Sequence, residues 1–193
     1  MKNSTLKYAR LGSVSHATLR TQDLLSAFIS TLEGLILVNG DYFASPENRA
    51  DRDRLNGLIG EAQDCFAEDG KEIDAEKEEA ADYLANESMI DALQEFAPPY
   101  VYFGSHPGDG ADIGFWPQDI ETIKEEIEFS SVATLRDARA LGIETDPEDP
   151  TLPPHAFRGE WLLIDERGSC ALYVRENGPA AGSYVDREMW SCV

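Results

Sequence analysis

The hydrophobic periodicity of the chain changes at Pro98-Pro99, and this change constrains the fold more than any other feature. Before the two prolines, apolar residues such as Leu25, Phe28 and Leu32 recur at helical spacing. After them, short apolar runs alternate with turn residues, as strands do. Because helices precede strands, the sequence predicts an α+β fold. In it, N-terminal helices pack on an antiparallel sheet formed by the central hairpin and the C-terminal strands.

Capping and turn residues give the expected bounds of these elements. We expect helices over residues 22–38, 46–68 and 75–96, with Thr21 and Asp74 as N-caps of the first and third. The other expected elements are strands over 100–103, 113–116, 161–165, 170–175 and 189–193, helices over 118–129 and 132–141, and a loop over 143–157. Residues 1–20 read as an N-terminal arm or short strand. The length suits a single domain over residues 1–193.

Charge is the unusual property of the composition. The chain has 37 acidic and 16 basic side chains, a formal net charge of −21. The excess is concentrated in two blocks: residues 61–95 hold 13 acidic and 2 basic side chains, and residues 109–149 hold 12 and 3. A field of that sign repels nucleic acid and anionic membranes and favours basic partners. We therefore expect no direct binding of nucleic acid or membrane.

Clustered carboxylates are the candidate partner-binding residues. They are Glu68, Asp69, Glu72, Asp74, Glu76, Glu78, Glu79 and Asp82, followed by Glu125, Glu126 and Glu128. Like charges three and four residues apart destabilise a helix, so clustering carries a cost that dispersal would avoid. One interpretation is a solvated helix face. The other is that helix-borne carboxylates imitate a phosphate track and occupy a groove lined with Lys and Arg, which binds nucleic acid by neutralising phosphates.

A glycine-rich loop after residue 104 contains His106, Asp109 and Asp112, residue types that bind divalent metals or transfer protons. The spacing matches no established metal or phosphate motif. Pro107-Gly108-Asp109-Gly110 also suits a tight hairpin turn, because Asp and Gly tolerate positive φ. The turn is the interpretation we favour, with no cofactor and no catalytic residue.

Cysteines and the N-terminus bear on the cellular compartment. Cys65, Cys170 and Cys192 are an odd, widely spaced set without a CxxC pair. This indicates core cysteines in a reducing environment rather than a disulfide framework or a zinc site. The first 20 residues lack the apolar stretch of a secretory signal. We therefore expect a cytoplasmic protein.

Three segments taken together resemble small acidic proteins of unassigned function from bacteriophages and other mobile elements. They are residues 12–20 with the helix that follows, residues 97–117, and the strand-rich tail. The second contains the Tyr-Phe-Gly-x-His-Pro-Gly-Asp-Gly sequence at 102–110. The resemblance implies a phage or mobile-element origin and supplies no catalytic residues. Because small acidic phage proteins are often inhibitors of host defence, it suggests that class by analogy.

These observations lead to one main hypothesis and two alternatives. The main hypothesis is a non-enzymatic, phage-type inhibitor of a host defence complex, anti-CRISPR or anti-restriction. It would act in the bacterial cytoplasm as an acidic nucleic-acid mimic that blocks a basic groove. Its partner would be a nucleic-acid-binding protein or ribonucleoprotein complex of the host. The alternatives are a small metal-binding protein or hydrolase using His106, Asp109 and Asp112, and an acidic protein-interaction module.

Overall fold

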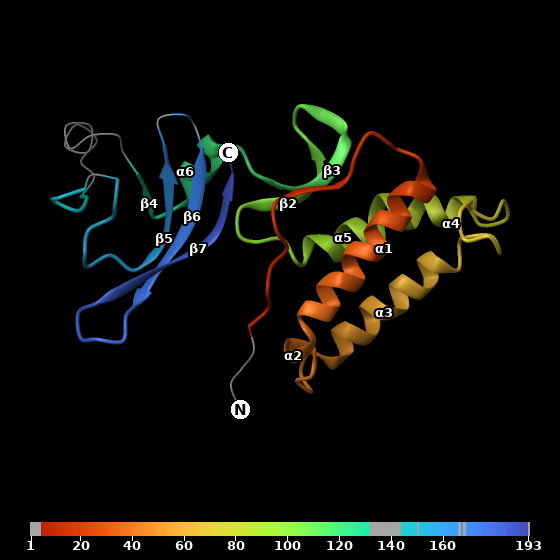
Figure 1. Ribbon diagram of the computed structural model, residues 1–193, viewed down its shortest axis with the longest axis horizontal. Coiled ribbons are helices and arrows are strands. Elements are labelled where there is room, and N and C mark those ends of the chain that lie inside the picture. Colours follow the sequence, from red (N-terminus) through yellow and green to blue (C-terminus); the bar gives the residue numbers. More distant parts are fainter. Residues whose placement is uncertain (1–4, 132–143, 150, 166, 168, 193) are drawn as a thin grey trace. The chain divides into compact units, whose positions relative to one another are not determined.

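The computed structural model describes residues 5–131, 144–149, 151–165, 167 and 169–192. It confirms the α+β class, with helices mainly in the N-terminal half and strands mainly in the C-terminal half (Figure 1). Contacts divide the chain into two compact units, Met1–Trp116 and Pro117–Val193. That the whole chain folds as one domain stays a prediction. The helix expected over 132–141 lies outside the described residues.

Unit 1 holds the helices and a small sheet. Its elements in chain order are β1 (Gly12–Ser15), α1 (Thr21–Val38), α2 (Gly40–Phe43), α3 (Arg49–Gln63), α4 (Glu78–Tyr83), the π-helical segment η1 (Leu84–Ser88), α5 (Met89–Gln94), β2 (Val101–His106) and β3 (Asp109–Pro117). Helix α1 contacts α3 and each part of the run α4–η1–α5, so the helices lie side by side (Figure 1).

The first predicted helix is confirmed as α1, whose apolar face forms much of the core of unit 1. Its buried residues are Leu24, Leu25, Phe28, Ile29, Leu32 and Leu35. The predicted N-cap is wrong: Arg20 occupies the cap position, and Thr21 is the first helical residue. Thr18 organises the helix start instead, because its hydroxyl donates to the Asp23 carboxylate at 2.7 Å and accepts from Arg20 N.

The second and third predicted helices are shorter than expected. Helix α3 ends at Gln63, and the next helical residue is Glu78. Asp74 is not the N-cap of α4; its carboxylate accepts from the backbone of Glu76, and Lys77 holds the cap position. A bridge between Phe66 and Ile73 folds the intervening residues back on themselves. Glu68 and Glu76, which were expected on these helices, therefore lie on the connection between α3 and α4.

The sheet of unit 1 has the order β1-β3-β2, so the N-terminal segment supplies an edge strand. The predicted hairpin is confirmed, with Pro107-Gly108 as a two-residue turn between β2 and β3. Phe103 on β2 packs edge-on against Phe28 of α1, with ring centroids 5.3 Å apart, and contacts Phe115 of β3 at 4.8 Å. These three rings attach α1 to the sheet.

The described elements of unit 2 are α6 (Ile120–Glu126), β4 (Phe129–Ser130), β5 (Gly159–Ile164), β6 (Cys170–Asn177) and β7 (Tyr184–Cys192). Strands β5, β6 and β7 pair antiparallel, and the short β4 pairs parallel with β5. The described strands thus form two sheets, one in each unit, and not the single sheet predicted. The central hairpin pairs with the N-terminal segment, a long-range pairing that hydrophobic patterns do not specify.

Of the described helices, α1 alone is long and apolar enough to cross a membrane by length and composition. The same properties are typical of a core helix in a soluble protein. Six residues of α1 are buried, and the helix contacts α3 and α5.

Candidate partner-binding site

The acidic segment, residues 61–95, carries its carboxylates on the outside of unit 1. Of its 13 acidic residues, 12 are exposed, and Asp74 is half-buried. The segment is described throughout. Its sequence places few basic residues among them, namely Lys71 and Lys77. A dense, solvent-facing array of carboxylates is therefore a property of the fold as well as of the composition.

The predicted site residues divide between a loop and a helix. Glu68, Asp69, Glu72, Asp74 and Glu76 lie between α3 and α4, whereas Glu78, Glu79 and Asp82 lie on α4. Of the first group, Glu68 and Glu76 were expected on helices, and that expectation is wrong for both. The loop is nevertheless organised, because the Asp69 carboxylate accepts from Lys71 N at 3.0 Å and Ala67 N donates to Glu72 O at 2.9 Å.

Repulsion between like charges disfavours an earlier start of helix α4. Side chains three and four residues apart on a helix are neighbours, and each like-charged pair costs a few tenths of a kcal/mol. A helix continuing back from Glu78 would pair Glu72 with Glu76, Asp74 with Glu78, and Glu76 with Glu79. On the loop, Asp69 and Asp74 instead accept backbone hydrogen bonds. Such local bonds compete with helix formation.

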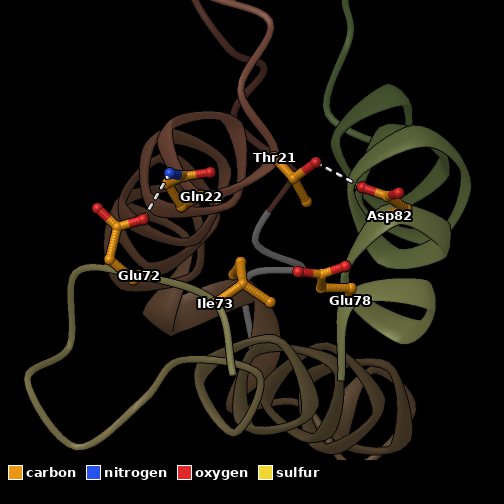
Figure 2. Close-up of a pocket in the computed structure, with 6 residues that line it drawn as sticks. All are labelled: Thr21, Gln22, Glu72, Ile73, Glu78 and Asp82. Carbon is orange, nitrogen blue, oxygen red and sulfur yellow. Dashed lines mark hydrogen bonds between the residues drawn. The ribbon is translucent and has the colours of Figure 1, made fainter. Parts of the chain in front are cut away.

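A hollow of about 330 Å³ lies where this loop meets the start of α1 (Figure 2). Its lining residues are Thr21, Gln22, Glu72, Ile73, Glu78 and Asp82. Gln22 Nε2 donates to Glu72 at 2.9 Å, and the Thr21 hydroxyl donates to Asp82. These bonds fix two of the three carboxylates, so the hollow has the chemistry to receive an ammonium or guanidinium group.

A second hollow, of about 450 Å³, lies between the end of α3 and the run α4–η1. It is lined by Glu61, Asp64, Cys65, Lys77, Ala80, Tyr83, Leu84 and Ser88. Helical periodicity places Ala80 and Leu84 roughly opposite Glu78 and Asp82, so the two hollows lie on different faces of α4. Burial raises the pKa of the Cys65 thiol above its ordinary value.

Tyr83 is the large apolar side chain of this region that faces solvent, with 64% of its surface exposed. It stands next to η1, and π-helical turns are frequent at functional sites. Aromatic residues on a charged surface are enriched at the centres of protein interfaces. The sequence analysis did not select Tyr83. The signal that could have indicated its exposure is its position next to Asp82 in a strongly charged stretch.

Ion pairing within unit 1 leaves most of this charge uncompensated. Among the described residues, the acidic segment forms ion pairs at Glu72, whose carboxylate lies 3.5 Å from Arg20, and at Glu95, 2.6 Å from Arg54. Both pairs are exposed, and exposed pairs contribute little to stability. The other carboxylates of the segment form no ion pair with a described residue.

The second predicted group belongs to unit 2. Glu125 and Glu126 are on α6, and Glu128 follows it; all three are exposed. Asp119 caps this helix, accepting from the backbone N–H groups of Glu121 and Thr122. Each unit thus carries acidic side chains of its own.

The hairpin residues are not assembled into a metal centre. His106 Nδ1 accepts from Gly108 N at 3.1 Å, and the Asp109 carboxylate accepts from Ala111 N at 3.0 Å, so both stabilise the turn. Asp112 instead faces His16 of the β1 region, at 3.6 Å. Within the described ranges, no group of three or more His, Cys, Asp or Glu is arranged to hold a metal ion.

No protein-family model matches the chain, and neither the curated proteins nor the solved structures include a match. The structure therefore describes an α+β protein whose exposed acidic segment lines a hollow with both charged and apolar walls.

Proposed function

We propose that the protein acts by binding. Its acidic segment docks on a basic, nucleic-acid-binding surface of a host protein or ribonucleoprotein complex and excludes nucleic acid from it. The observation that carries the proposal is the exposure of 12 of the 13 carboxylates between residues 61 and 95. A surface that neutralises phosphates with Lys and Arg gains affinity from any dense set of fixed negative charges.

The positions of the carboxylates on the α3–α4 loop and on α4 support this proposal further than the acidic composition alone does. Carboxylates fixed by Gln22, Thr21 and Arg20 lose less conformational freedom on binding than free side chains do. Tyr83, Ala80 and Leu84 in the second hollow add apolar contact area to the charged surface. The combination favours one defined partner over general attraction to cations.

The biological setting of the proposal is host defence. The resemblance to small acidic phage proteins supports an anti-CRISPR or anti-restriction inhibitor working in the bacterial cytoplasm. In that role, the protein needs no catalytic residue and no cofactor, since occupying the groove is sufficient.

Competition tests the proposal. Tagged protein is used to capture partners from a bacterial lysate, and each purified partner is titrated with labelled duplex DNA and labelled single-stranded RNA. The proposal expects the protein to displace one of these nucleic acids, with weaker displacement as salt rises. A ternary complex of the partner, its nucleic acid and this protein would contradict it.

A further inference from the structure

Two cysteines far apart in sequence lie directly opposite each other in unit 2. Cys170 opens β6, and Cys192 is the last residue of β7; the antiparallel register pairs them. Their sulfur atoms are 2.7 Å apart. Directly opposed residues on antiparallel strands have Cβ atoms about 4.5–5.5 Å apart, close to the separation that a disulfide spans.

An irregularity in β7 produces this pairing. The register shifts between Leu172 and Tyr173, where Tyr173 pairs with Glu188 but Leu172 pairs with Trp190. Continuing the first register would place Ser191 opposite Cys170. The bulge at Met189 moves Cys192 into that position. Because β7 has one extra residue at the bulge, its side chains beyond the bulge point to the face opposite to the one that strict alternation would give.

The thiols of Cys170 and Cys192 differ in their exposure to solvent. Cys170 is 3% exposed and is flanked on its other side by Ile164 of β5. Cys192 is half-exposed at the end of the outer strand. Cys65, the remaining cysteine, is buried in unit 1.

We propose that Cys170 and Cys192 are a site of reversible covalent modification, closing an intramolecular disulfide by exchange with a small-molecule disulfide. This inference does not depend on the proposed function.

The exchange proceeds in two balanced steps. The Cys192 thiol loses its proton, and its sulfur attacks the small disulfide, forming a mixed disulfide and releasing one small thiol. Cys170 then loses its proton and attacks the Cys192 sulfur, forming the protein disulfide and releasing the second small thiol. The protein is oxidised by two electrons, the small disulfide is reduced by two, and both protons leave on the released thiols.

Local environment sets the order of the steps. Burial, followed by the contact with Cys192, raises the pKa of Cys170 to about 12, so its thiolate is scarce at neutral pH. Because the thiolate is the nucleophile, the more accessible Cys192 attacks first, and Cys170 reacts once the mixed disulfide lies beside it.

Oxidised glutathione is the probe for the test. Incubating the full-length, fully reduced protein with it is expected to lower the mass by about 2 Da, and peptide mapping should show Cys170 joined to Cys192. Cys65 should remain free and serves as the internal control. An unmodified protein, or joining of Cys65 to either of the others, would overturn the proposal.

Single substitutions test the order. Cys170→Ser should stop at a stable glutathione adduct on Cys192, because the resolving thiol is absent. Cys192→Ser should leave Cys170 unmodified over the same time. Equal accumulation of the adduct in wild-type protein and Cys170→Ser would show that Cys170 does not resolve it, and would overturn the proposal.

Discussion

Arg175 and Asp186 lie opposite each other on β6 and β7 and form a bidentate ion pair. Arg175 Nε donates to one carboxylate oxygen at 2.7 Å, and Nη2 donates to the other at 2.8 Å. The Arg175 side chain is fully buried. Its Nη1 donates to the carbonyl of Pro153 at 2.9 Å, and its guanidinium lies 3.8 Å from the centre of the Tyr184 ring. One cation thus connects two strands with the loop before β5.

Removing the Asp186 carboxylate should destabilise unit 2 strongly. Asp186→Ala leaves the Arg175 charge buried without its partner, which costs about 3–5 kcal/mol in comparable sites. In the wild-type protein, the hydrogen bond that Arg175 donates to Asp186 raises the pKa of Arg175. The variant lacks this bond, but an arginine guanidinium stays protonated in proteins, so the buried charge remains. Urea denaturation measures the loss. The control is Glu176→Ala, which breaks the exposed pair with Arg187 in the same strands and should cost less than about 1 kcal/mol. Equal losses would contradict the account.

Asn39 is predicted to hold the N-terminal segment on α1. This residue is 2% exposed; its Oδ1 accepts from Lys7 N at 2.6 Å, and its Nδ2 donates to Lys7 O and Leu35 O. Asn39→Ala should lower the free energy of unfolding by about 1–3 kcal/mol, because buried backbone groups lose their partner. The segment before β1 should also exchange amide hydrogens faster. Asn86→Ala, at an exposed helical position, should change stability by less than about 0.5 kcal/mol.

Close approach of β1 and β3 makes Gly114 irreplaceable. A Cβ there would lie 2.1 Å from the carbonyl oxygen of Gly12 on the paired strand. Gly114→Ala should therefore separate β1 from β3 and lower the melting temperature by several degrees, since about 1 kcal/mol shifts it by roughly 2–8 °C. Gly110→Ala in the same strand meets no neighbouring atom and should leave the melting temperature nearly unchanged. A comparable fall for both variants would argue against the β1–β3 contact.

The buried thiol predicts a pH dependence of stability. In the folded reduced protein, the pKa of Cys170 is raised to about 12, whereas an unfolded thiol titrates at its ordinary value of about 8.5. Between these values, the unfolded chain loses a proton that the folded chain keeps, so rising pH favours unfolding. Urea midpoints of the reduced protein should fall more steeply with pH in this window than those of Cys170→Ser. Parallel pH profiles would show that Cys170 does not contribute.

The sequence predicts the elements whose information is local. Helix α1 has its own apolar periodicity, and the β2–β3 turn has Pro107-Gly108, so both are found where expected. Long-range relationships were missed. Nothing local pairs Gly12 with Phe115, and the bulge at Met189 that aligns Cys170 with Cys192 leaves no sequence pattern. Arg175 alternates with apolar residues in β6, but its burial depends on Asp186 across the sheet.

The sequence predicted which acidic residues form the candidate site, but it assigned some of them to the wrong secondary structure. Exposure of Glu78, Glu79 and Asp82 on α4 follows from helical patterning. Glu68 and Glu76, expected on helices, fall on the connection between α3 and α4, which contains the Phe66–Ile73 bridge. The second hollow forms because the end of α3 lies beside η1, and no local sequence pattern encodes that contact.

Charge reversal on the acidic segment tests the central claim most directly. Glu68, Glu76 and Glu79 are exposed, and replacing all three with Lys spares the carboxylates fixed by Arg20, Gln22 and Thr21. The matched control is Glu33→Lys with Asp41→Lys and Glu47→Lys, an equal change of charge at exposed positions of unit 1 outside the segment. Circular dichroism should show both variants folded.

The measurement is the concentration of protein that displaces half of the labelled nucleic acid from the captured partner. The account predicts that the Glu68, Glu76 and Glu79 variant needs at least about 100-fold more protein than wild type, as expected when several charge contacts of about 1 kcal/mol or more become repulsive. The control should stay within about threefold of wild type, because distant charges are screened beyond a Debye length of roughly 8 Å. Equal displacement by both variants would contradict the account.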